Sequence, residues 1–127
     1  MWLDNVSDMD NILISYIRDN KNQKIGMLIS GINKYKNNNV CIGWSLCNKQ
    51  DQFDKYIGFD IAQGRTYLND RIYENHVDEN FNIFEFIPKT VIKNLPKFLI
   101  KIYKYYKKEE LSNLTSFLLN SFFTFED

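Results

Sequence analysis

The sequence predicts an α+β domain in which an antiparallel meander of three or more strands precedes a helix after Cys47 and further C-terminal helices. Residues 11–47 contain three apolar runs separated by polar, Asn-rich segments, which is typical of strands joined by turns. After residue 48, apolar residues recur at helical spacing. The chain has 127 residues, of which 44% are hydrophobic. We therefore expect one domain, residues 1–127, with a substantial core.

The first half of the chain is expected to supply the strands. NILISYIRD, residues 11–19, precedes a polar turn and predicts the first strand. KIGMLISGINKY, residues 24–35, predicts the second strand, with Gly26 and Gly31 as bulges or points of close approach. The turn at residues 36–39 is rich in Asn, which tolerates positive φ. Residues 40–47 then form the third strand.

The stretch CNKQDQFDKYIGFDIAQGR, residues 47–65, predicts a helix that contains two glycines. Its apolar positions recur at intervals of four, three and four residues and predict a face turned toward the core: Ile57, Ile61, Gly64 and Leu68. The N-cap is expected at Asn48 or Asp51. We expect the helix to end near residue 73.

The C-terminal part is expected to be mainly helical. Residues 81–87 predict a short strand or extended segment that ends before Pro88. Residues 88–95 predict a helical turn. Pro96 suits the first turn of a helix ending near residue 109, and residues 111–122 predict the last helix.

The two glycines suggest that something lies against the helix after Cys47. Glycine inside a helix costs about 1 kcal/mol relative to alanine, so Gly58 and Gly64 favour close approach of another helix, a partner subunit or a ligand. Close packing on a strand of the same domain remains the alternative. The free N–H groups at the helix start predict an anion site. Lys49 adds a charge beside that site, and Arg65 a planar fork for phosphate. Phe53 is expected to be either a stacking plate or a core residue.

Charge and motifs exclude several function classes. The 16 basic and 16 acidic residues balance, which argues against a protein that coats nucleic acid. The sequence contains no phosphate loop, zinc spacing or EF-hand pattern, and its single histidine, His76, is expected in a surface loop. We therefore expect a protein that is not an enzyme and uses no cofactor or metal.

No apolar run approaches the roughly 18 residues of a membrane span. Cys41 and Cys47, about 20 Å apart along one strand, are expected to be free thiols in a reducing cytoplasm.

Six lysines follow one another at helical spacing without an intervening acidic residue, and we call them the lysine row: Lys89, Lys93, Lys97, Lys101, Lys104 and Lys108. They predict either an anion-binding face or the solvated side of an amphipathic helix. A bend at Pro96 would interrupt the row. Another alternative is a protein-interaction module that inhibits a host enzyme through the apolar segment 116–125.

Residues 40–68, VCIGWSLCNKQDQFDKYIGFDIAQGRTYL, resemble small phage proteins in which a strand leads into a helix with the pattern NKxDxFxxxxGxxIAxGR. The chain is similar to the Thoeris anti-defence proteins of the first type, which sequester cyclic ADP-ribose isomers, the alarm signal of a bacterial anti-phage system. The residues carried over from the matching run are Asn48, Lys49, Asp51, Phe53 and Arg65.

The resemblance implies a homo-oligomer built from dimers, with ligand pockets at subunit contacts. It implies binding of a cyclic ADP-ribose isomer without turnover, in the cytoplasm of the infected bacterium, and binding of cyclic oligonucleotides at a second site. Arginine and lysine would bind the diphosphate, an aromatic ring the purine, and Asn or Asp the ribose hydroxyls. The sequence leaves open which cyclic nucleotide is preferred and how many subunits assemble.

Overall fold

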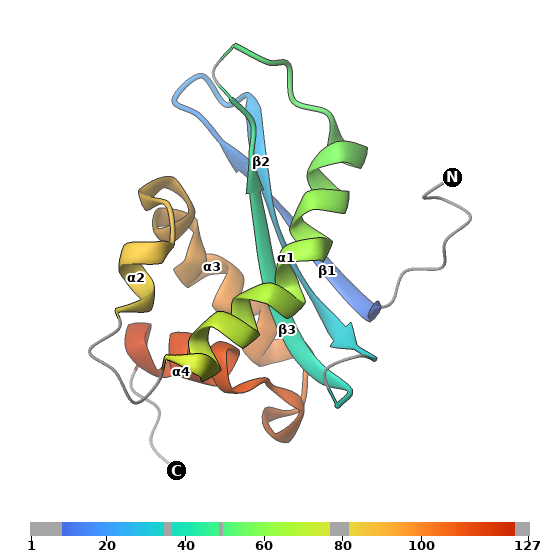
Figure 1. Cartoon of the computed structure of the whole chain (residues 1–127). Helices are drawn as coiled ribbons and strands as arrows, with labels where there is room; N and C mark the ends of the chain where they lie inside the picture. Colours follow the sequence, from blue (N-terminus) through green and yellow to red (C-terminus); the bar gives the residue numbers. More distant parts are fainter. Residues whose placement is uncertain (1–8, 35–36, 49, 77–81, 124–127) are drawn as a thin grey trace.

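A three-stranded antiparallel sheet lies between one long helix and a layer of shorter helices in the computed structural model (Figure 1). The structure describes residues 9–34, 37–48, 50–76 and 82–123. The predicted α+β fold, with its meander followed by helices, is confirmed. No helix in these ranges has the length and apolarity that a membrane crossing requires.

The sheet has the order β1-β2-β3, with antiparallel neighbours. Its strands are β1 (Met9–Arg18), β2 (Lys24–Asn33) and β3 (Asn39–Leu46). Both glycines of β2 lie where the sheet is crowded, as predicted. A Cβ at Gly26 would meet the Ser45 carbonyl oxygen, and one at Gly31 would meet the Met9 side chain.

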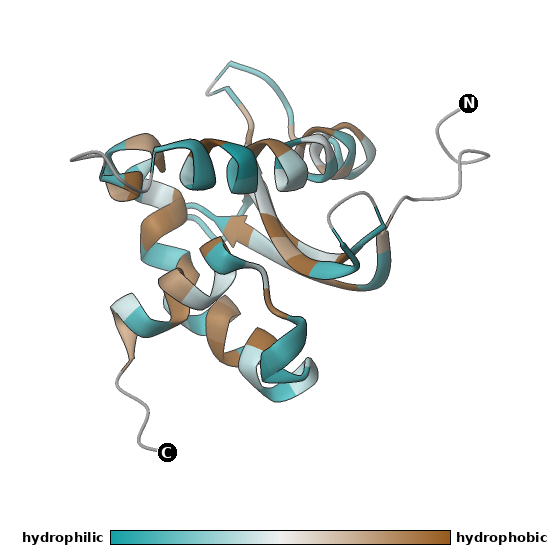
Figure 2. Cartoon of the chain, turned by 60° about the horizontal axis from the view of Figure 1, so that its bottom comes forward, coloured by the Kyte–Doolittle hydropathy of each residue, from teal (hydrophilic) through white to brown (hydrophobic). Residues whose placement is uncertain are grey.

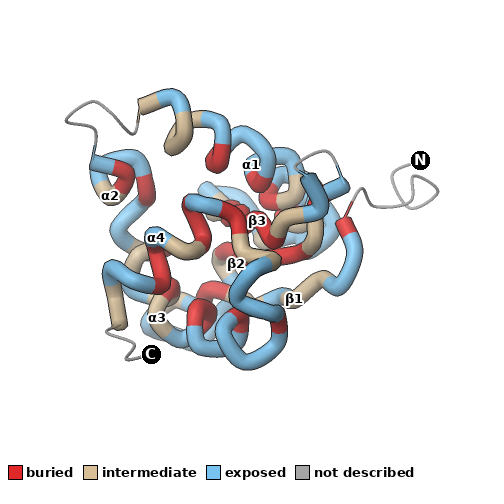
Figure 3. The backbone as a smooth tube through the Cα atoms, turned by 90° about the horizontal axis from the view of Figure 1, so that it is seen from below, coloured by how far each residue is buried: buried red, intermediate tan, exposed pale blue. Residues whose placement is uncertain are grey.

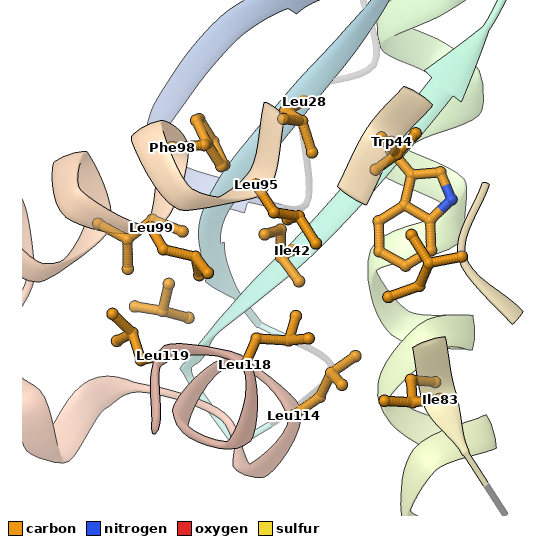
Figure 4. Close-up of a cluster of buried hydrophobic side chains, with 14 of the residues drawn as sticks. Leu28, Ile42, Trp44, Ile83, Leu95, Phe98, Leu99, Leu114, Leu118 and Leu119 are labelled. Atoms are coloured by element: carbon orange, nitrogen blue, oxygen red, sulfur yellow. The ribbon is translucent and has the colours of Figure 1, made fainter. Parts of the chain in front are cut away.

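The strand period of two gives the sheet two different apolar faces. One face contributes Leu28, Ile42 and Trp44 to a large core that is completed by the C-terminal helices (Figure 4). The opposite face contributes Met27 and Ile29 to a smaller core under α1. The sheet is thus covered on both sides, and α1 lies over the smaller core.

Helix α1 (Lys55–Asn75) begins later than predicted. Its N-cap is Asp54, whose Oδ1 accepts hydrogen bonds from the backbone N–H groups of Tyr56 (2.8 Å) and Ile57 (3.2 Å). The expectation of a cap at Asn48 or Asp51 is wrong, because both lie in the non-helical segment before the helix. The helix ends two residues beyond the predicted end.

The face of α1 that meets the sheet is the small one. Gly58, Ala62 and Thr66 are buried, whereas Ile57 and Ile61, expected on the core face, are 60% and 41% exposed. Figure 3 shows buried positions recurring along one side of the helix. The predicted core face is therefore wrong. The small side chains of this face let the helix backbone approach β3 closely. Larger side chains on the same face would hold the helix away from the strand.

The C-terminal layer consists of α2 (Ile83–Phe86), α3 (Lys89–Tyr105), the 3-10 turn η1 (Lys108–Glu110) and α4 (Asn113–Phe122). Hydrophobic and hydrophilic residues alternate along these helices in Figure 2, as expected for helices with one face against a core. The final helix agrees with the prediction to within two residues.

Two expectations for this layer are wrong. Residues 83–86 of the segment expected to be a strand or extended form α2, and the Asn82 side chain accepts from the Phe84 N–H. The helical turn and the helix expected after it form the single helix α3, so Pro96 lies inside a helix and not in its first turn. Packing of Val91, Leu95 and Phe98 into the large core compensates for the backbone hydrogen bond that Pro96 cannot donate.

Candidate functional site

The β3–α1 segment, residues 47–54, carries most of the predicted site residues and is held in a compact turn. The Cys47 N–H donates to the Ile25 carbonyl (2.7 Å), and the Asp51 N–H donates to the Asn48 carbonyl (3.0 Å). The Cys47 thiol reaches the Asp51 carbonyl oxygen at 3.2 Å. These bonds fix the segment beside the β1–β2 turn. Lys49 lies outside the described residues.

Two pockets flank this segment. The hairpin pocket, about 780 Å³, lies between the segment and the β1–β2 turn; its lining includes Arg18, Asn22 and Lys24. The helix pocket, about 400 Å³, lies toward the start of α1; its lining includes Ile57 and Ile61. Both volumes fall in the range of roughly 300–1,000 Å³ that small-molecule sites occupy.

The same short stretch lines both pockets, through Cys47, Asn48, Asp51, Gln52 and Phe53. The structure therefore brings together three of the five predicted site residues, namely Asn48, Asp51 and Phe53. The Asn48 side-chain amide lies 3.5 Å from the Asp51 carboxylate. A ligand that contacts this stretch could extend into either pocket.

The hairpin pocket contains two cations that the sequence analysis did not single out. Arg18 donates from Nη1 to the Asn22 carbonyl oxygen at 3.0 Å, and the Lys24 ammonium lies 4.0 Å from the centre of the Tyr16 ring. The Asp19 carboxylate in the same pocket accepts two backbone N–H groups of the β1–β2 turn at 2.9 Å each. Asp19 thus shapes the turn, while Arg18 and Lys24 supply positive charge to the pocket.

Phe53 packs against the core, which is one of the two roles expected for it, while stacking on a ligand stays a prediction. Its ring packs against the smaller core, edge-on to Tyr16 with ring centroids 6.1 Å apart. A Cβ at Gly58 would lie 3.0 Å from Cε1 of Phe53, so the ring rests almost on the helix backbone. Gly58 therefore accommodates a side chain of its own chain. The partly buried ring also lines both pockets.

Arg65 lies elsewhere and lines neither of these two pockets. Its Nη1 donates to the Trp44 carbonyl oxygen at 3.0 Å, and Asn69, one turn further along α1, donates to the Ile42 carbonyl oxygen at 3.2 Å. Both carbonyls belong to the edge strand β3. Four residues of helix rise about 6 Å and two residues of strand about 6.7 Å, so the donors match the acceptors.

We call the hydrogen bonds from Arg65 and Asn69 to the β3 carbonyls the edge cover. The sequence analysis missed the edge cover and assigned Arg65 to phosphate binding. The Ser112 N–H and the Thr115 hydroxyl cover a third carbonyl of β3, that of Val40, at 2.9 and 3.1 Å. Satisfied carbonyls at an edge strand prevent its pairing with another chain. The spacing of four between Arg65 and Asn69 was the available signal, but it has meaning only once α1 is known to run beside β3.

The predicted anion site at the start of α1 is occupied by the chain itself. Asp54 bonds the N–H groups of Tyr56 and Ile57, and its carboxylate satisfies the positive end of the helix dipole. The expectation that these N–H groups are free is therefore wrong. Among the described residues that line the two pockets, the cations available to a phosphate are Arg18 and Lys24.

The remaining predicted features lie apart from the two pockets. The lysine row runs along exposed positions of α3 and ends at η1, and the Lys101 ammonium donates to the Ser15 hydroxyl at 2.7 Å. Cys41 and Cys47 are free thiols, as predicted. Among the described ranges, no group of three or more His, Cys, Asp and Glu side chains could hold a metal ion.

Comparison of the chain with protein-family models, with curated proteins and with solved structures finds no match.

Proposed function

We propose that this chain is a phage anti-defence protein that binds a cyclic ADP-ribose-type nucleotide and sequesters it without degrading it, which blocks Thoeris immunity. The ligand class comes from the sequence resemblance over residues 40–68. One observation supports a binding role for that stretch: three residues of the resembling pattern, Asn48, Asp51 and Phe53, line two pockets on the two sides of one segment.

The chemistry of the hairpin pocket suits the three parts of such a ligand. Arg18 and Lys24 would bind the diphosphate, since guanidinium and ammonium groups form charge-assisted hydrogen bonds with phosphate oxygens. The ring of Phe53 would contact the purine. Asn48 and Asp51 would hydrogen-bond the ribose hydroxyls, because an amide and a carboxylate accept from hydroxyl donors.

Sequestration also requires tight binding. A nanomolar dissociation constant corresponds to about −12 kcal/mol, and pockets open to water on one subunit make electrostatic contacts weaker than enclosed ones do. We therefore include in the proposal that the chain acts as a homo-oligomer whose subunits enclose the ligand. Cyclic oligonucleotides are proposed as a second ligand class, and no described residue is assigned to them.

The test uses a cyclic ADP-ribose isomer mixed with a small excess of protein. The mixture is passed through a filter that retains the protein, and the retained fraction is then denatured by heat. We expect the nucleotide to disappear from the filtrate and to return chemically unchanged after heating. Nucleotide that stays in the filtrate would contradict binding, and a new product after heating would contradict sequestration without turnover.

A pair of variants locates the site. Arg18→Ala combined with Lys24→Ala removes two cations from the hairpin pocket, and we expect it to weaken retention at least tenfold. The matched control is Lys93→Ala combined with Lys97→Ala, which removes two exposed cations from α3. Equal weakening by the two double variants would show general charge attraction and would contradict the assigned pocket.

The lysine row favours a second candidate function, a nucleic-acid-binding face, because α3 continues through Pro96 and keeps five of the six lysines on one helix. Binding of this kind should weaken steeply as salt rises. Titration of a short duplex at two salt concentrations separates the candidates. The α3 double variant, and not the hairpin-pocket double variant, would then reduce binding.

A further inference from the structure

The outer face of α1 exposes apolar side chains that no part of its own sheet covers. Ile57, Ile61 and Leu68 are 60%, 41% and 47% exposed, although all three lie on an ordered helix. They follow the intervals of four and seven residues that place side chains on one helical face. We call this row, together with Gly64, the outer stripe of α1.

Gly64 gives the outer stripe a flat centre. A Cβ built at this glycine would meet no atom of the described residues within 4 Å, so no packing contact among these residues requires glycine there. The cost of about 1 kcal/mol relative to alanine is therefore not explained by packing inside the subunit. Glycine at the centre of an apolar stripe does allow a second helix to approach its backbone closely.

We propose that the outer stripe is the contact between two copies of this chain, with their α1 helices crossing antiparallel at Gly64. A two-fold axis through Gly64 places the glycines of the two copies against each other. Ile61 of each copy then lies near Leu68 of the other, since they are three and four residues from the axis on opposite sides. The same patch thus serves both copies, as a two-fold interface requires.

The exposed apolar area accounts for most of what such a dimer needs. The stripe and the Tyr67 side chain beside it, which is 39% exposed, present on the order of 350 Å² if a free Ile, Leu or Tyr exposes about 180–220 Å². Each half of a standard interface buries about 800 Å², of which roughly 450 Å² is apolar. The stripe supplies about three quarters of that apolar area.

The rest comes from the adjoining β3–α1 segment. Ile57 and Ile61 belong to the outer stripe and also line the helix pocket, together with residues of that segment. A second copy seated on the stripe would therefore cover the mouth of the helix pocket. This contact gives the proposed assembly into dimers a defined surface that also encloses part of the proposed site.

Charge selects the antiparallel arrangement. Asp60 and Arg71 flank the stripe on the same side, about 6 Å and about 10 Å along the axis from Gly64 in opposite directions. Antiparallel crossing brings Asp60 of one copy within reach of Arg71 of the other, whereas in parallel pairing the charged flanks of the two copies lie on opposite sides of the interface, where this pair does not form. The antiparallel arrangement therefore gains two pairs of opposite charges that the parallel arrangement lacks.

The first test measures self-association without nucleotide, so that its outcome is independent of the proposed ligand. Sedimentation equilibrium of the native chain at about 1–200 µM should detect a dimer. We expect Leu68→Glu to raise the dimer dissociation constant at least tenfold. The matched control is Ile100→Glu, an exposed isoleucine of α3 at 41% exposure, which should leave it unchanged. A monomer at the highest concentration, or equal effects of the two variants, would overturn the inference.

The second test locates the axis. Gly64→Cys in a Cys47→Ser background places one accessible thiol at the proposed crossing, where Cα atoms must approach to within about 7 Å to form a disulfide. Mild oxidation should link two copies through residue 64. Asn120→Cys in the same background, on the exposed face of α4, is the control. Linking that is no faster through residue 64 than through residue 120 would overturn the antiparallel crossing.

Discussion

Replacement of Gly43 by alanine should destabilise the protein far more than the addition of a single methyl group suggests. Gly43 lies in the middle of β3, where α1 crosses the strand, and an added Cβ would collide with the carbonyl oxygen of Ala62 in α1. It would also lie 2.8 Å from Cγ2 of Thr66. A collision with a backbone oxygen cannot be relieved by rotation of a side chain, so the helix must move away from the sheet.

The magnitude follows from overpacking. Extra methylene groups in a well-packed core typically cost 1–3 kcal/mol, and here the displaced group is a helix backbone. That helix carries Arg65 and Asn69, whose bonds to the β3 edge would lengthen with it. We expect a loss of about 3 kcal/mol in the free energy of unfolding, which lowers Tm by roughly 10 °C for a domain of this size.

Urea unfolding followed by far-ultraviolet circular dichroism measures this loss. The control is Gly64→Ala at about 1 µM, where a dimer of moderate affinity is dissociated. Because a Cβ there meets no described atom within 4 Å, this variant should gain about 1 kcal/mol from helix propensity. The same change from glycine to alanine should thus lower the free energy of unfolding at residue 43 and raise it at residue 64. A Gly43→Ala variant within 0.5 kcal/mol of the native chain, about the size of an ordinary surface effect, would refute the described contact between α1 and β3.

Three further predictions concern buried or half-buried polar groups. Burial raises the pKa of Tyr106 to about 12. Because the pKa in the folded state exceeds the unfolded value near 10, the stability linked to this hydroxyl is present below pH 10. It is lost as the pH rises toward 12. Urea midpoints at pH 9.5 and 11.5 should show this loss in the native chain and a smaller loss in Tyr106→Phe. Asn69→Ala should cost about 1–3 kcal/mol by the same assay, because it leaves the buried Ile42 carbonyl without its donor; a neutral result would contradict the edge cover. Cys47 should react with a thiol reagent in the folded protein and more slowly with bound nucleotide, whereas buried Cys41 should react only on unfolding. Equal rates for the two thiols would contradict the described burial.

Much of the fold could be predicted because it depends on local pattern. Three apolar runs with Asn-rich turns predicted the meander, and the helical spacing after Cys47 predicted a helix that the structure places at Lys55–Asn75. Boundaries were less accurate where several residues could act as a cap. Asn48, Asp51 and Asp54 are all good N-caps. Because Asn48 and Asp51 belong to the compact turn at residues 47–54, the helix begins only after Asp54.

The candidate site could be predicted only in part. The resembling stretch identified Asn48, Asp51 and Phe53, which the structure brings together around two pockets. The two cations of the hairpin pocket, Arg18 and Lys24, lie about thirty residues earlier in the chain. No local pattern relates them to the β3–α1 segment, because the pairing of β1 with β2 and of β2 with β3 is what places them beside it.

By itself, the sequence determined the three strands and the presence of a long helix after them, since side-chain periodicity and turn-forming residues act over a few positions. The tertiary structure decided which side of α1 faces inward. An apolar row is normally the buried one. Here the backbone of α1 lies so close to Gly43 of β3 that an isoleucine or leucine side chain would not fit between them. The small face of Gly58 and Ala62 therefore packs inward, the apolar row is left outside, and Arg65 is brought to the strand edge.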